Sequence, residues 1–95
     1  MKFKIAVSLI AREETLEAVI YYEDIRLGLG EDFLEDLDER YIAISENPYA
    51  YSYTDNKCIL RDVSLNRFPY VVIYKIQPEN IVIISVHNTH KKITE

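Results

Sequence analysis

The pattern of apolar and polar residues in the first half of the chain predicts a strand followed by two helices. Apolar residues alternate with polar ones along residues 2–7, as in a half-buried β-strand. Residues 11–28 have apolar side chains at helical spacing, with Ser8 as the expected N-cap. A second helical pattern covers residues 31–45 and ends before Pro48, because the residue before a proline avoids helical geometry. Two consecutive helices, each with one apolar face, predict an antiparallel helical hairpin.

The same periodicity predicts which side chains the two helices bury. The residues expected to share the apolar face of the first helix are Ala11, Thr15, Ala18, Tyr22 and Ile25. The residues expected to be buried by the second helix are Phe33, Leu34, Leu37, Tyr41 and Ile44. The runs of carboxylates between these positions are interpreted as the solvated faces that amphipathic helices require.

Three further strands are predicted in the second half, at residues 57–63, 70–76 and 81–87. The linker at 77–80, "QPEN", suits a tight hairpin. The last two strands are apolar almost throughout, so we expect them to lie centrally in the sheet or to be covered on both faces. The predicted fold class is α+β, in the order β-α-α-β-β-β, with the helical hairpin packed on a mainly antiparallel sheet. We expect residues 1–95 to form a single domain.

Composition and charge narrow the function classes. The 95 residues carry a net charge of −5, which argues against indiscriminate binding to nucleic acid, since that requires a basic surface. The charge is uneven, because residues 56–95 hold six lysines and arginines but three acidic residues. A single cysteine, Cys58, allows no internal disulfide and favours a reducing compartment. The N-terminal apolar run is too short for a membrane span and lacks a signal-peptide cleavage pattern, so a cytoplasmic location is expected.

Six pieces of sequence, in order along nearly the whole chain, carry a resemblance to a known family. They are "A..ET.EA..YYE" across 11–23, "GLGEDF" at 28–33, "ENPYAY" at 46–51, Arg61, "RFPYVVIY" at 67–74 and "SVHNTH" at 85–90. Taken together with the order of elements, they resemble the RelE/ParE superfamily of bacterial type II toxins, in particular its plasmid-stabilisation branch.

This resemblance implies a small toxin that inhibits growth and is held inactive by a cognate antitoxin, in a hetero-oligomer. RelE-like members cut mRNA at the ribosome, as ribosome-dependent endoribonucleases, and ParE-like members poison DNA gyrase. Neither target implies a cofactor. Two alternatives stay open: a non-toxic relative that only binds an antitoxin, and a generic interaction domain that uses the tyrosines of residues 49–53. For these tyrosines, contact with a protein partner is favoured over stacking on bases.

Ribosome-dependent mRNA cleavage, the mechanism placed first, needs a cation for the phosphate and acid–base groups on one sheet face. The residues predicted to be catalytic are Arg61, which would stabilise the phosphate, His90 as general acid or base, and His87. Val71 stands where RelE-like members usually have an arginine, which keeps gyrase inhibition open as the alternative. Two histidines offer only two metal ligands, so no metal site is predicted.

Four further residues are predicted to bind the substrate: Lys57 and Lys91 along the nucleic-acid backbone, and Arg67 and Tyr74 at the mouth of the sheet. For Arg61 and Arg67 a structural role is the alternative, either as ion pairs with the acidic helices or as charges at a strand edge.

Overall fold

The computed structural model describes residues 3–89. In chain order its elements are β1 (Ile5–Val7), α1 (Leu9–Ile25), α2 (Leu29–Glu46), a 3-10 turn (Pro48–Ala50), β2 (Leu60–Ser64), β3 (Tyr70–Ile76) and β4 (Ile81–Asn88). The four strands form one sheet in the order β1-β4-β3-β2. The β1–β4 pair is parallel, and the other two pairs are antiparallel. The predicted α+β class and the order β-α-α-β-β-β are confirmed.

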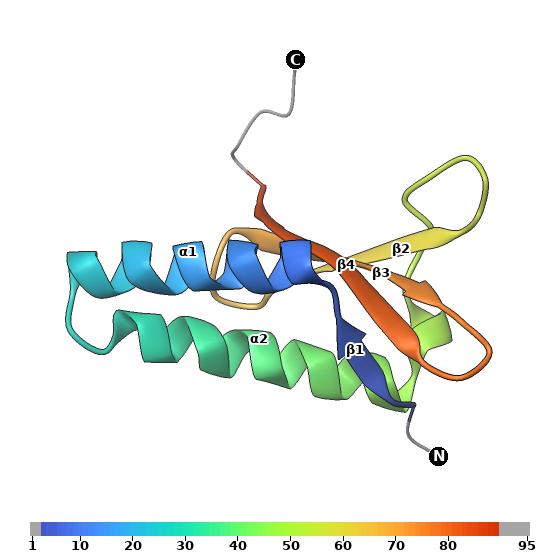
Figure 1. Ribbon diagram of the computed structural model, residues 1–95, viewed down its shortest axis with the longest axis horizontal. Helices are drawn as coiled ribbons and strands as arrows, with labels where there is room; N and C mark the ends of the chain where they lie inside the picture. The colour runs from blue at the N-terminus through green and yellow to red at the C-terminus, as the bar shows by residue number, and fades with distance from the viewer. Residues whose placement is uncertain (1–2, 90–95) are drawn as a thin grey trace.

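The helices form the predicted antiparallel hairpin, and Figure 1 shows α1 and α2 side by side. Both carboxylate oxygens of Glu23 accept hydrogen bonds from the turn between the helices, at 2.9 Å from the amide of Gly28 and 3.0 Å from that of Gly30. Gly28 has a φ of 90°, a left-handed conformation that favours glycine. A Cβ atom on Gly30 would lie 2.8 Å from the carbonyl oxygen of Val19, so this glycine lets the helices approach closely.

The core lies between the hairpin and one face of the sheet. Its fully or nearly fully buried apolar side chains are Ala11, Ala18, Phe33, Leu37, Ile44, Leu65, Tyr70, Val72, Tyr74, Ile81, Ile83 and Val86. Two predicted core positions are wrong, because Ile25 is 58% exposed and Leu34 is 39% exposed. Ile25 lies in the last turn of α1, where the hairpin extends beyond the sheet (Figure 1), so periodicity alone placed it against a surface that is absent there.

The boundaries of the last two strands follow the prediction closely, whereas β1 begins at Ile5 instead of in the first residues of the predicted range 2–7, and β2 also begins late. Strand β3 matches the predicted range, β4 is one residue longer, and both lie centrally in the sheet as expected. The predicted strand at 57–63 begins instead at Leu60, because residues 57–59 belong to a turn. In that turn Cys58 has a φ of 58°, and the Asp55 carboxylate accepts hydrogen bonds from the amides of Ile59 and Leu60. Within residues 3–89, no helix is long and apolar enough to cross a membrane.

Candidate functional site

The register of the sheet places the two described catalytic candidates on opposite faces. Arg61 pairs with Tyr74 across β2 and β3, and directly opposed residues project to the same side of a sheet. Tyr74 is fully buried, so this side is the one that the helical hairpin covers. His87 pairs with Val71, the neighbour of the core residues on β3, and therefore projects to the open side. The prediction that Arg61 and His87 share one catalytic face is wrong.

Arg61 is held by the three tyrosines of the loop that precedes β2. Its guanidinium group donates hydrogen bonds to the carbonyl oxygens of Tyr51 at 2.6 Å and Tyr49 at 3.5 Å, and to the Tyr53 hydroxyl at 2.9 Å. The guanidinium carbon also lies 4.0 Å from the ring centroid of Tyr53 and 5.5 Å from that of Tyr49. These partners are carbonyls and rings, and not the helical carboxylates that the structural alternative named. Arg61 thus organises the tyrosine loop.

A shallow cleft of about 340 Å³ adjoins this arginine, and we call it the tyrosine cleft. Its lining residues are Tyr49, Tyr53, Cys58, Ile59, Arg61, Lys75 and Ile76. The structure brings Lys75 to the cleft rather than the predicted Lys57, which is exposed in the turn before β2. The sequence signal for Lys75 was its position as the lone basic residue inside an apolar strand.

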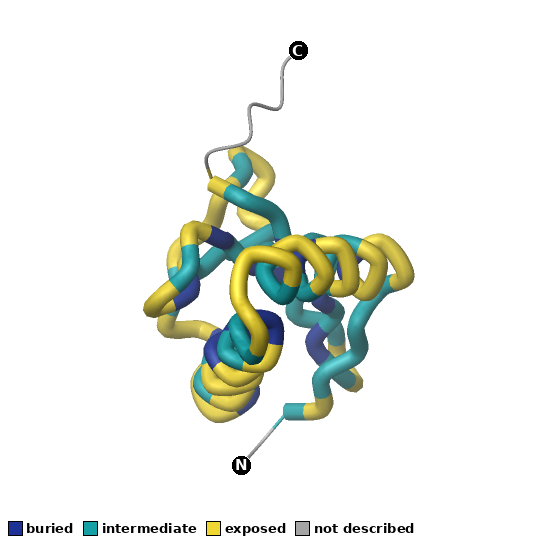
Figure 2. Tube along the Cα trace, turned by 90° about the vertical axis from the view of Figure 1, so that its left-hand side faces the viewer, coloured by how far each residue is buried: buried dark blue, intermediate teal, exposed yellow. Residues whose placement is uncertain are grey.

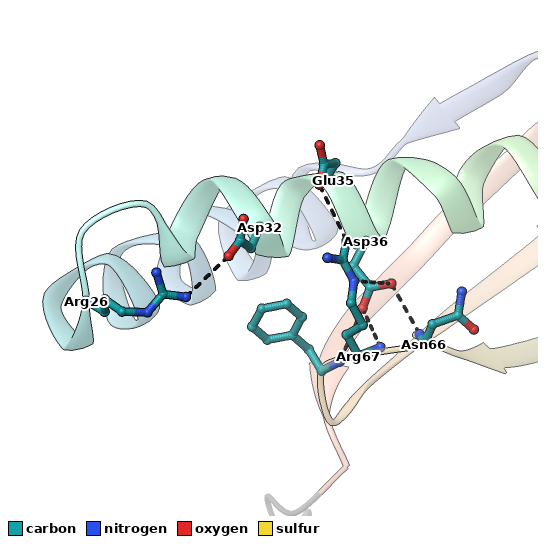
Figure 3. A network of polar contacts seen from close by, with 7 residues as sticks. Arg26, Asp32, Glu35, Asp36, Asn66 and Arg67 are labelled. Atoms are coloured by element: carbon teal, nitrogen blue, oxygen red, sulfur yellow. Dashed lines mark hydrogen bonds and ion pairs between the residues drawn. The ribbon is translucent and has the colours of Figure 1, made fainter.

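Arg67 belongs to a polar network that ties the β2–β3 loop to α2, which Figure 3 shows. Its guanidinium group forms long ion pairs with Glu35, at 3.7 Å, and with Asp36, at 3.9 Å. The fully buried Asp36 carboxylate also accepts hydrogen bonds from the backbone amides of Asn66, Arg67 and Phe68, at 3.3, 2.8 and 3.2 Å. For Arg67 the structural alternative, an ion pair with an acidic helix, is confirmed.

Asp36 itself corrects the interpretation of the helical carboxylates. It sits in the acidic run that the sequence suggested was solvated, yet it is 0% exposed. A buried carboxylate needs several hydrogen-bond donors, and the loop supplies three backbone amides. The sequence did contain a signal for its burial: Asp36 follows Phe33 by three residues and precedes Leu37, which places it on the buried face of α2.

Tyr74 was predicted to meet a ligand, and this prediction is wrong. The side chain is 0% exposed, and its hydroxyl donates a hydrogen bond to the carbonyl oxygen of Pro48 at 2.5 Å. Burial raises the pKa of Tyr74 to about 12. The residue joins β3 to the 3-10 turn and supports the start of the tyrosine loop.

A second cleft, of about 570 Å³, opens between α1 and β4, and we call it the α1–β4 cleft. The polar and aromatic residues that line it include Glu14, Glu17, Tyr21, Tyr70, Ser85 and His87. Strand β1 pairs only with residues 81–83 of β4. Beyond these residues α1 lies along the edge of β4, and the cleft lies between the two elements.

A chain of hydrogen bonds connects His87 to α1 at this cleft. The Nδ1 atom of His87 lies 3.0 Å from the Ser85 hydroxyl, which donates to Glu14 Oε1 at 2.9 Å. The same carboxylate oxygen accepts a second hydrogen bond, from the backbone amide of Val86 at 2.8 Å, on the edge of β4 beyond its pairing with β1. Sequence reasoning missed Glu14 and Ser85, although the two-residue spacing of Ser85 and His87 places both on one side of a strand.

The remaining predicted residues, His90 and Lys91, lie outside the described residues. Within residues 3–89, no three histidine, cysteine, aspartate or glutamate side chains gather as a metal site requires.

Comparisons with known proteins give the fold. No protein-family model matches the chain, and no curated protein matches it by sequence. Among solved structures, it is similar to the chromosomal ParDE toxin–antitoxin system from P. aeruginosa, at 13% identity and a TM-score of 0.77, over 94% of this chain and 98% of that one. It is also similar to a free mutant form of the E. coli toxin RelE, at 15% identity and a TM-score of 0.63, over 95% of this chain and 86% of that one. The chain therefore has the RelE/ParE fold, with two helices packed on a four-stranded mixed sheet.

Proposed function

We propose that this protein is the toxin of a type II toxin–antitoxin pair, which inhibits growth and is neutralised by a cognate antitoxin in the cytoplasm. The observation that carries the proposal is the likeness of fold to a ParDE system over 94% of the chain. The six pieces of sequence that resemble the RelE/ParE superfamily, from residues 11–23 to residues 85–90, support the same function independently of the fold.

An exposed apolar stripe on α1 supports the existence of a protein partner. Leu9, Leu16 and Ile20 are 70%, 60% and 54% exposed. Their spacings of seven and four residues place them on one side of the helix, opposite the buried Ala11 and Ala18. Figure 2 shows how much of the hairpin surface is exposed. Apolar side chains gathered on a surface in this way are typical of protein interfaces, and we assign this stripe to the antitoxin.

For the mechanism, the geometry favours a gyrase-type inhibition by binding over cleavage of mRNA. A ribonuclease site needs a cation and an acid–base group on the same side of the sheet, and Arg61 and His87 project to opposite sides. Val71, the direct cross-strand neighbour of His87, adds an apolar side chain instead of a cation. Ribosome-dependent cleavage is the second candidate, supported by the half-buried His87 on the open side, and it would also draw on His90.

The test is induced expression of the chain, alone and together with a neighbouring antitoxin gene. We expect growth arrest that the antitoxin relieves, no new mRNA 5′ ends at ribosomal A sites, and inhibited supercoiling by purified gyrase. Lys4→Ala, at an exposed position away from both clefts, serves as the control for the histidine variants described next, and it should arrest growth like the wild type.

Two outcomes would contradict parts of this proposal. New A-site cuts that disappear in His87→Ala or His90→Ala would replace the gyrase mechanism with the ribonuclease one. No arrest in any strain would refute the toxin function and favour the non-toxic relative that only binds an antitoxin.

A further inference from the structure

The hydrogen-bond chain at the α1–β4 cleft determines which nitrogen of His87 carries the proton. An ionised carboxylate can only accept hydrogen bonds, so the Ser85 hydroxyl must direct its single hydrogen to Glu14, 2.9 Å away. The Ser85 oxygen is then an acceptor for Nδ1 of His87, at 3.0 Å. A neutral His87 therefore has its hydrogen on Nδ1 and a lone pair on Nε2.

The charged groups of the cleft are both carboxylates, while the hydroxyls of its two tyrosines and the side-chain amide of Asn88 can donate as well as accept. Glu17 follows Glu14 by three residues, so the two carboxylates lie on the same side of α1, and both line the cleft. The ring of Tyr21, which is 59% exposed, forms an apolar wall, and the core residue Tyr70, which is 9% exposed, lies at the base of the cleft. Among the described residues that line it, none is a lysine or an arginine.

We propose that the α1–β4 cleft receives the guanidinium group of an arginine from the partner protein. A guanidinium is planar, carries five donors and no acceptor, and stacks on aromatic faces, which matches two carboxylates, a histidine lone pair and the exposed ring of Tyr21. A phosphate would instead meet Glu14 and Glu17, both negatively charged, without a lysine or arginine among the described lining residues. The cleft is thus a specificity site for a basic peptide. The identification of that partner as the antitoxin rests on the proposed function, whereas the chemistry of the cleft does not.

The direct test is an NMR titration of the isotope-labelled protein with N-acetyl-arginine methylamide, compared with its neutral citrulline analogue and with inorganic phosphate. We expect shifts at Tyr21, Tyr70 and His87 with the arginine probe, and binding about three-fold or more weaker for citrulline, as for the loss of an exposed ion pair. Equal binding of the two probes, or shifts at these residues with phosphate alone, would overturn the proposal.

Matched variants locate the effect. Glu17→Gln should weaken the arginine probe by about two- to five-fold, and Glu13→Gln, an exposed glutamate of the same helix outside the cleft, should not change it. Equal effects of the two variants would show only a general influence of charge, and would refute a site in the cleft.

The tautomer gives a separate readout. Nitrogen chemical shifts of His87 should report the hydrogen on Nδ1 in the wild type and a shift toward the Nε2-protonated form in Ser85→Ala. An Nε2-protonated wild type would refute the acceptor role of His87. Failure of the proposed function is distinguishable, because absence of growth arrest would leave binding of the arginine probe intact.

Discussion

Replacing the buried Asp36 by asparagine should destabilise the protein strongly, although the two side chains have nearly the same shape. The carboxylate accepts backbone hydrogen bonds from Asn66 on Oδ1, and from Arg67 and Phe68 on Oδ2. An amide group offers only one oxygen. In its best orientation this oxygen keeps the bonds of Arg67 and Phe68, and the NH₂ group then faces the amide of Asn66, donor against donor.

The magnitude follows from these three bonds. Hydrogen bonds to a charged group contribute about 1.5–3 kcal/mol each, whereas neutral ones contribute about 0.5–1.5 kcal/mol. Asp36→Asn weakens two bonds from the first class to the second and leaves one buried donor without an acceptor. Because the losses within one network are not additive, we expect about 2–4 kcal/mol less stability. That is a large fraction of the roughly 5–15 kcal/mol of a typical domain.

Urea unfolding followed by far-ultraviolet circular dichroism measures this change as a shift of the midpoint. The control is Glu35→Gln, which removes only the long, exposed ion pair to Arg67 and should change stability by less than about 0.5 kcal/mol. A value for Asp36→Asn as small as that of the control would show that the loop amides do not depend on this carboxylate, and the assignment of Asp36 as the anchor of the β2–β3 loop would fail.

Three other changes test the packing and the candidate site. Gly30→Ala should lower stability by about 1–3 kcal/mol in the same unfolding assay, because its Cβ would lie 2.8 Å from the backbone of α1; an unchanged midpoint would contradict this close helix contact. In an alkaline titration followed by tyrosinate absorbance, Tyr74 should ionise near pH 12. Since its folded-state pKa is raised from 10.0, the stability it contributes is complete below pH 10 and is lost as the pH rises toward 12, so an ionisation near pH 10 without unfolding would refute its burial. Arg61→Ala should speed chymotryptic cleavage at residues 49–53, whereas the exposed-site control Lys4→Ala should not; equal rates would contradict the role of Arg61 in holding the loop.

The elements that could be predicted from the sequence are those determined by local patterns. The apolar runs at 70–76 and 81–87 predicted two central strands, and both lie between neighbouring strands in the sheet. The β2 boundary could not be predicted as well. The residue at 58 adopts a left-handed conformation that its sequence does not signal, since Cys58 is neither glycine nor asparagine.

The roles of the charged side chains were less accessible, because they depend on partners distant in sequence. Arg67 meets α2 through residues more than thirty positions away, and the partners of Arg61 are carbonyl oxygens, which every residue has. A sequence shows that a charge is present, but not which uncharged backbone groups surround it. The resemblance could therefore identify Arg61 as a candidate, but only the structure shows that its partners are the backbone carbonyls and rings of the tyrosine loop.

The position of His87 depends on one irregularity of the sheet. Ile81 and Ile83 are buried, so strict alternation along β4 would turn Ser85 and His87 toward the core as well. The pairing shifts at this point, since Ile73 opposes Ser85 and Tyr74 opposes Ile83, which leaves Ile84 as an extra residue. This β-bulge reverses the sides of everything that follows, and it brings the Ser85 hydroxyl within reach of Glu14. The bulge therefore absorbs Ile84 and keeps Ser85 and His87 on the open side, opposite Ile73 and Val71. Deletion of Ile84 should remove the bulge and leave these cross-strand partners unchanged, so a crystal structure of the variant should still show His87 on the open side.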